Sequence, residues 1–256
     1  MSAPLLVEFF SQLPEHLVRR HEVSPLEPQE EGRQGEGEKP ARSRAGGKAR
    51  DRAALHGFQK QVRERYTEGT LLRLLHSPDA QCRRAAAFAL GLLGGPDAQR
   101  PLAVSLHDDD AEVALAAADA LWSLWFRADS PEHNEELQRL LRLRSREKAL
   151  AGLDRLVERA PEFAEAYNQR AILLFRLREF ERSIADCERV LALNPYHFGA
   201  QAGLGQCYLQ LGKHRAALKA FRAALRINPH LDGVAETVRA LENTLGEEGR
   251  RDDKGR

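Results

Sequence analysis

Apolar residues along most of the chain recur at the three- and four-residue spacing of amphipathic helices. From about residue 52 onward, these stretches follow one another with only short polar breaks. Alanine, leucine, arginine and glutamate, which favour helices, dominate the composition. The 10 Val, 3 Ile and 4 Thr among 256 residues are too few for an extensive sheet. The pattern therefore predicts an all-α protein.

The N-terminal region departs from this regular pattern. Residues 4–20 carry a short amphipathic signal, with apolar side chains at Leu6, Phe9, Phe10, Leu13 and Leu17. This signal predicts an arm that either docks loosely on the protein or binds a partner through a tether, and the sequence leaves open whether residues 1–20 dock. Residues 22–50 are rich in proline, glycine and charge without apolar periodicity, so we expect them to be disordered.

The charges of this region are segregated into an acidic part and a basic tract at 39–52. Such a tract can contact nucleic acid, but this one has no interleaved aromatic residues on which bases could stack. A solvated linker is the preferred interpretation, and nucleic-acid contact is the alternative.

Residues 70–94 and 101–125 form an internal repeat with an offset of 31. The segment TLLRLLHSPDAQCRRAAAFALGLLG matches PLAVSLHDDDAEVALAAADALWSLW at most leucine and alanine positions. Each copy predicts a short helix, a polar turn and a longer helix whose small side chains allow close packing. This pattern resembles the HEAT-like repeats of phycobilin lyase subunits and bacterial scaffold proteins. That family often pairs aspartate with arginine between stacked turns; the first copy has Arg83 after its turn, and the second has Ala114 instead.

A second repeat, with a different period, follows in the C-terminal half. Prolines at 161, 195 and 229 are 34 residues apart, in the contexts ALNPYHF and RINPHLD for the last two. Small residues recur where two helices of a unit would cross, at Ala171 and Gly205. This pattern is similar to that of tetratricopeptide repeats. The resemblance implies two clear units over 164–231, a degenerate unit over 130–163, and a terminal helix that covers the last repeat.

Together, the two resemblances imply a bacterial-type repeat protein with a right-handed α-solenoid fold. Residues 52–128 would form HEAT-like helix pairs that continue into tetratricopeptide pairs and a capping helix over 129–246. Residues 1–51 would be an arm with a disordered charged linker, and 247–256 a disordered tail. Because no flexible linker separates the two repeat types, the aromatic residues Trp122, Trp125 and Phe126 are expected to pack at the junction; an exposed binding patch is the alternative.

The sequence lacks the signatures of common catalytic and cofactor sites. It has no P-loop, no GxSxG and no HExxH motif, and its three cysteines form no CxxC pair. We therefore expect no catalytic residues, no metal site and no cofactor. Free cysteines favour a reducing compartment, the cytoplasm. A net charge of +1 makes nucleic-acid binding an unlikely general role, and no apolar stretch is long enough to cross a membrane.

The tetratricopeptide resemblance also implies a binding surface, because the first helix of each unit lines a concave groove in that family. The positions carried over are Asn134, Gln138, Arg142, Asn168, Gln169, Ile172, Phe175, Arg176, Gln206 and Gln210. Carboxamides can hydrogen-bond a peptide backbone, and the arginines can meet acidic side chains. Alternatively, these residues only keep the inner face hydrated. The carboxylate clamp of chaperone cochaperones is not expected, because its positive charges are missing.

These observations favour a non-enzymatic cytoplasmic scaffold that binds a peptide or helix of another protein. The sequence does not identify that partner. Two alternatives remain at this point: a subunit associated with a bilin-lyase-like or other enzyme, and an adaptor that contacts nucleic acid through residues 39–52.

Overall fold

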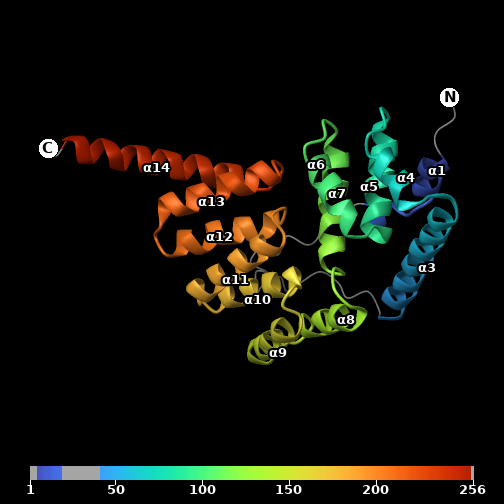
Figure 1. Ribbon diagram of the computed structural model, residues 1–256, viewed down its shortest axis with the longest axis horizontal. Coiled ribbons are helices and arrows are strands. Elements are labelled where there is room, and N and C mark those ends of the chain that lie inside the picture. Colours follow the sequence, from blue (N-terminus) through green and yellow to red (C-terminus); the bar gives the residue numbers. More distant parts are fainter. Residues whose placement is uncertain (1–4, 19–40, 255–256) are drawn as a thin grey trace. The chain divides into compact units, whose positions relative to one another are not determined.

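The computed structural model describes residues 5–18 and 41–254, and within these ranges the secondary structure is helical, with no strand (Figure 1). The predicted all-α solenoid class is therefore confirmed. The chain divides into two compact units, with the division after Leu124. This division lies a few residues before the boundary expected at 128/129, because Trp125 packs within the second unit.

Helices of the first unit form the two pairs that the 31-residue repeat predicts, α4 with α5 and α6 with α7. They are preceded by the arm and by one long helix. In order, the elements are α1 (Leu5–Ser11), α2 (Glu15–Val18), α3 (Ala41–Arg65), α4 (Glu68–Leu74), α5 (Ala80–Leu93), the 3-10 turn η1 (Pro96–Ala98), α6 (Gln99–Ser105) and α7 (Ala111–Trp125).

Small residues bring α5 and α7 into close contact. A Cβ atom at Gly91 would lie 2.8 Å from the Cα atom of Ala120, which is closer than real Cβ atoms approach. Only glycine fits at this crossing. The alanine-rich helices of the repeat thus pack through their backbones, as the small residues predicted.

The N-terminal arm belongs to the first unit and is not loosely docked. Helix α1 contacts α5 and α3, and its side chains Leu6, Phe9 and Phe10 are buried. Leu17 of α2 is buried as well. The hydrophobic spacing of the arm was recognisable in the sequence, but the surface that receives it is formed only by tertiary packing.

Helix α3 begins at Ala41, within the charged segment 22–50 for which the sequence predicts disorder. Phe58 and Val62 anchor the second half of α3 by burial. Most of the basic tract 39–52 is therefore helical, while Lys39 and the rest of the expected linker lie outside the described residues. Helix α14 likewise extends to Lys254, into the segment 247–256 for which a disordered tail is predicted.

An ion pair joins the two stacked turns of the first unit. The Nε and Nη2 atoms of Arg83 donate to the two carboxylate oxygens of Asp108, at 2.7 Å each. Arg83 also donates to the carbonyl oxygen of Ser77 in its own turn, at 3.0 Å. One arginine therefore suffices for the pairing between turns, although the second copy lacks its own.

Replacing Asp108 with asparagine should destabilise the first unit by about 1–3 kcal/mol at pH 7, the range for a charged hydrogen bond that is lost. The hydrogen bond from Arg83 lowers the pKa of Asp108 below its usual value. The carboxylate therefore contributes stability above about pH 4, and this contribution is lost as the pH falls through the lowered pKa. Urea titrations followed by circular dichroism should show the difference between parent and variant shrinking below pH 4.

Asp109→Asn is the matched control, because Asp109 is exposed and the change in charge is the same. The Asp109→Asn variant should unfold like the parent both at pH 7 and below pH 4. Equal effects of the two substitutions would show that the general charge of the turn matters, and not the Arg83–Asp108 pair.

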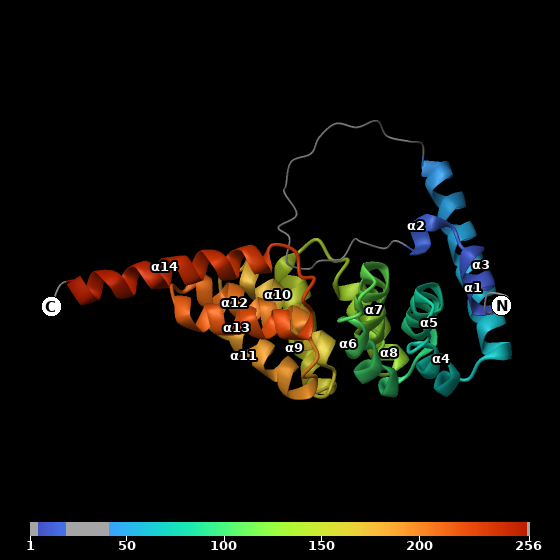
Figure 2. The same cartoon turned by 90° about the horizontal axis from the view of Figure 1, so that it is seen from above.

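The second unit contains three helix pairs and a terminal helix, as the 34-residue repeat predicts. Its helices are α8 (Pro131–Leu140), α9 (Arg146–Arg159), α10 (Ala164–Arg176), α11 (Phe180–Leu193), α12 (Phe198–Gln210), α13 (His214–Ile227) and α14 (Val234–Lys254). Helices α10 to α14 pack successively side by side (Figures 1 and 2). Val234, Val238 and Leu241 of α14 are buried in one cluster with Phe221 of α13, so the terminal helix covers the last repeat.

Small and polar residues fix the crossings of this unit. A Cβ atom at Gly205 would lie 2.6 Å from the ring of Phe221, so glycine makes room for that ring. In the degenerate pair, Gly152 makes the same kind of room for Leu140. Arg170 on α10 then ties three helices together, because it donates to Asp154 on α9 at 2.9 Å and to Asp186 on α11 at 2.7 Å.

Candidate functional site

The first turn of α10 contains a fully buried carboxylate. Glu165 has 0% of its surface exposed, and its Oε1 atom accepts hydrogen bonds from Asn168 Nδ2 at 3.1 Å and Gln169 Nε2 at 2.6 Å. Its Oε2 atom lies 3.1 Å from Nε2 of His197, which is also fully buried. The backbone N–H of Ala200 donates to Nδ1 of His197 at 3.1 Å, so Nε2 carries the proton that is donated to Glu165.

An aromatic ring covers this polar cluster within the second unit. Trp125 is 2% exposed, and its ring stacks on His197 with centroids 4.1 Å apart and planes 19° apart. Phe198 packs against the other part of the indole, at 5.2 Å between ring centroids. Of the two interpretations of the junction aromatics, Trp125 therefore fits packing and not an exposed patch.

Three of the ten residues predicted for the groove are committed to local structure. Asn168 and Gln169 are buried and donate to Glu165. Asn134 donates from Nδ2 to the carbonyl oxygen of Asp129 at 2.8 Å and so shapes the turn before α8. These three side chains order the inner face at its base.

The other seven predicted residues remain accessible. Gln138, Arg142, Arg176 and Gln210 are exposed, and Ile172, Phe175 and Gln206 are half-buried. Two helices that contact each other, α10 and α12, bring five of the seven together. On α10, the three- and four-residue spacing of Ile172, Phe175 and Arg176 places them on one face. These five accessible residues therefore lie in the later halves of α10 and α12.

Sequence reasoning missed His197 and its pairing with Glu165. His197 follows Pro195 in a turn, where a polar residue is expected to face water, and its partner Glu165 is 32 residues away. A separation close to the 34-residue period brings equivalent parts of neighbouring units together. An acid and a histidine offset by almost one repeat are the signal that could have identified this pair.

The cysteines show no sign of thiolate chemistry. Cys82, Cys187 and Cys207 are free and buried. Burial raises the pKa of both Cys187 and Cys207, so these two thiols are protonated at neutral pH. They act as small apolar side chains in the helix interface, which agrees with the interior position that the repeat gives Cys187.

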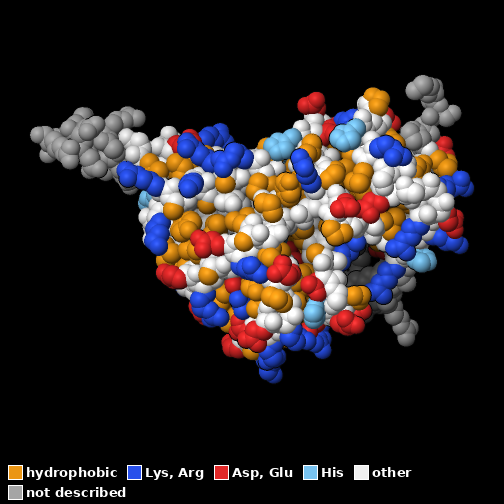
Figure 3. All heavy atoms as spheres, viewed as in Figure 1, with side chains coloured by type: hydrophobic (Ala, Val, Ile, Leu, Met, Phe, Trp, Pro, Cys, Tyr) orange, Lys and Arg blue, Asp and Glu red, His pale blue; other side chains and the backbone are white. Residues whose placement is uncertain are grey.

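The face of the molecule shown in Figure 3 carries charges of both signs. Figure 3 shows basic and acidic side chains interspersed over the face in view, with small hydrophobic groups between them. No three His, Cys, Asp or Glu residues of the described ranges are grouped in a way that could hold a metal ion. No helix in the same ranges is both long and apolar enough to cross a membrane.

Comparison with protein families agrees with the two repeat periods. The model for HEAT repeats matches residues 50–122 and 67–153, and the model for the tetratricopeptide repeat matches residues 134–198 and 168–232. The chain contains HEAT repeats followed by tetratricopeptide repeats. The HEAT matches run from the second half of α3 through α7 and continue into α8 and α9, where they overlap with the tetratricopeptide matches, which run from α8 to α13.

Curated relatives share the repeats over part of their length. A TPR repeat-containing protein of Rhizobium etli is 35% identical over 97 residues, which are 38% of this chain and 48% of the relative. Human superkiller complex protein 3 is 27% identical over 146 residues, which are 56% of this chain and 8% of that protein. The chain thus spans about half of the Rhizobium protein and a small fraction of the human one.

Solved structures with a similar fold are also tetratricopeptide proteins. The first TPR of Spaghetti (RPAP3), bound to the HSP90 peptide SRMEEVD, is 21% identical and matches 45% of this chain and 91% of its own, with a TM-score of 0.42. The complex of the TPR2AB domain of yeast Sti1 with pHSP90 is 20% identical and matches 78% of this chain and 79% of its own, with a TM-score of 0.38.

Proposed function

We propose that this protein is a non-enzymatic scaffold whose tetratricopeptide part binds a peptide or helix of a partner protein on its concave inner face. The observation that carries the proposal is the group of accessible residues in the later halves of α10 and α12. There Ile172 and Phe175 are half-buried apolar residues on one face of α10, and Arg176 of α10 and Gln210 of α12 are exposed. Repeat proteins use rigid extended faces of this kind to bind other proteins.

The chemistry of these residues defines the partner segment. Apolar side chains at Ile172 and Phe175 favour a partner with an apolar anchor, and Arg176 favours a nearby Asp or Glu. Gln206 and Gln210 can hydrogen-bond the partner's backbone. The buried state of Asn168 and Gln169 removes two polar contacts from the base of the groove, so recognition is concentrated on the later turns. A clamp for a C-terminal carboxylate is not part of this proposal.

The compartment proposed for this role is the cytoplasm. Three free, buried cysteines support a reducing environment.

Charge reversal at Arg176 tests the proposed groove. Peptides that bind the full chain would be selected from a displayed library of random 12-residue sequences, then measured by fluorescence anisotropy. Arg176→Glu should weaken binding about 10- to 100-fold, which corresponds to about 1–3 kcal/mol for a lost charge-assisted contact. The melting temperature should stay near that of the parent, because Arg176 is exposed.

Arg215→Glu on α13 is the matched control, since Arg215 is also exposed and the change in charge is identical. It should leave peptide binding unchanged. If Arg215→Glu weakens binding and Arg176→Glu does not, the outer face binds the peptide and the groove assignment is wrong.

A further inference from the structure

The arm, residues 5–18, contacts the HEAT part as an amphipathic segment. Helix α1 has only 7 residues, too few to be stable in isolation, so its helical form depends on the surface beneath it. Leu6, Val7, Phe9 and Phe10 are buried on one face. Glu8 and Ser11 point away and are exposed.

Helices α3 and α5 form the surface that receives the two phenylalanines. The ring of Phe10 meets the ring of Phe88 edge-on at 5.3 Å, and Phe58 of α3 meets Phe88 at 5.4 Å. Two arginines complete the contact: Arg84 lies over the Phe10 ring at 5.6 Å, and Arg65 lies over the Phe9 ring at 5.8 Å. Each arginine can make a cation–π interaction with the ring below it, and a helix without aromatic residues at these two positions would lose both interactions.

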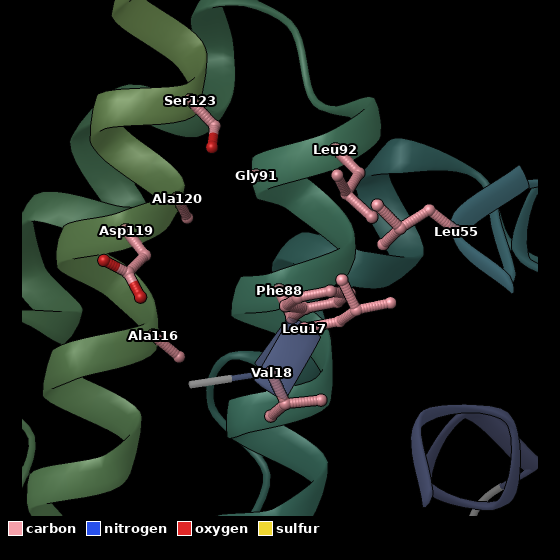
Figure 4. A pocket seen from close by; sticks show the side chains of 10 residues that line it. All are labelled: Leu17, Val18, Leu55, Phe88, Gly91, Leu92, Ala116, Asp119, Ala120 and Ser123. Atoms are coloured by element: carbon pink, nitrogen blue, oxygen red, sulfur yellow. The ribbon is translucent and has the colours of Figure 1, made fainter. Parts of the chain in front are cut away.

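The arm leaves part of this surface unfilled. Figure 4 shows Leu17 and Val18 of α2 near Phe88 of α5, and Leu92 of α5 beside Leu55 of α3. The other wall is lined by residues of α7, namely Ala116, Asp119, Ala120 and Ser123. A cavity of about 50 Å³ remains between them. A water molecule takes up roughly 30 Å³. The arm therefore covers the groove between α5 and α7 without filling it to the density of a protein interior.

In sequence, the arm is joined to α3 only through residues 19–40, so its two short helices are held on the HEAT part by noncovalent contacts. A segment attached in this way binds intramolecularly at a millimolar effective concentration. A competitor in solution must exceed this advantage, either by its own concentration or by filling the groove better.

We propose that the face formed by α3, α5 and α7 is a docking surface for a short amphipathic helix of a partner protein. Residues 5–18 occupy this surface as a tethered internal ligand, which the partner displaces. The partner helix carries two adjacent pairs of large apolar residues separated by one polar residue, as in Leu6-Val7-Glu8-Phe9-Phe10, with aromatic residues in the second pair facing Arg65 and Arg84. This surface lies in the HEAT part and is independent of the tetratricopeptide groove proposed above.

A synthetic peptide of residues 1–20 with a fluorescent label is the probe for this surface. Full-length protein carrying Phe9→Asp and Phe10→Asp should bind it at least tenfold more tightly than the parent, whose own arm blocks the site. Adding Arg65→Glu, at an exposed position, should weaken binding again. The control variant, Glu8→Ala with Ser11→Ala, changes only the outward side of the arm and should behave like the parent. Equal affinity of the parent and the Phe9/Phe10 variant would overturn the proposal.

A second measurement covers the case in which the Phe9/Phe10 variant does not fold. A protease site placed within residues 19–40 of the parent allows the tether to be cut while the arm stays native. The labelled peptide should enter after cleavage and not before, and a peptide with both phenylalanines changed to aspartate should not enter. Failure of the labelled peptide to enter the cut protein overturns the proposal. A parent that is dimeric, and becomes monomeric with the Phe9/Phe10 changes, also overturns it, because the arm would then serve a second copy.

Discussion

Replacing Glu165 with alanine is expected to lower the free energy of unfolding by about 3–5 kcal/mol, the effect of removing one partner from a buried charged cluster. Glu165 is fully buried and accepts hydrogen bonds from Asn168, Gln169 and His197. Without it, three buried polar side chains lose their acceptor while water stays excluded. Urea titration of the full chain, followed by circular dichroism, measures the loss as a lower midpoint.

Glu162→Ala is the control for this prediction. Glu162 lies three residues earlier, its side chain is 78% exposed, and it pairs with Arg189 at 3.3 Å. Because exposed pairs contribute little, the variant should unfold within about 0.5 kcal/mol of the parent. A Glu165→Ala midpoint equal to that of the control would mean that water reaches the cluster and that its hydrogen bonds are replaceable.

Trp125→Ala should destabilise the second unit by about 3–5 kcal/mol, the range for truncating a buried aromatic residue. Its ring stacks on His197 and packs against Phe198, so its removal opens a cavity directly above the Glu165 cluster. Thermal unfolding should show a melting temperature lower by roughly 6 °C or more, at about 2–4 °C per kcal/mol for a chain of this size.

Trp125→Phe keeps a ring against His197 and should lose much less stability than Trp125→Ala. A double variant with Glu165→Ala should lose less than the sum of the two single losses, because both substitutions admit water to the same cluster. Strict additivity would show that the indole and the carboxylate stabilise the unit independently.

The helices and their pairing could be predicted from the sequence because they are local and repeated. The 31-residue offset places α5 and α7, and the 34-residue offset places α10 to α13. Each period averages over several apolar positions, so a departure at a single position does not hide the pattern. The docking of the arm lacked such support: four apolar side chains in a single short helix fit either a bound or an unbound segment.

For the proposed groove of the tetratricopeptide part, the sequence predicted which types of side chain are present, but not which of them are exposed to solvent. The family resemblance places Asn168, Gln169 and Arg176 alike on first-helix positions. Their different roles depend on Glu165, which takes the two carboxamides as donors, and on Trp125, which covers His197 nearby. In the same way, Ala114 suggested that the turns of the HEAT part lack an ion pair, whereas Arg83 of the preceding turn provides it.

The hydrogen bond between Glu165 and His197 has a consequence for how the tetratricopeptide part unfolds. Stacked repeats often fray from one end, since each unit contacts only its neighbours. Here a buried hydrogen bond joins Glu165 of one unit to His197 at the start of the next. Arg170 of α10 in addition links α9 and α11 through Asp154 and Asp186. Opening one unit alone would leave a polar side chain of its neighbour without its hydrogen-bond partner. We therefore expect the repeats from α9 to α12 to unfold as one cooperative block, with fraying beginning at the far end, at α13 and α14.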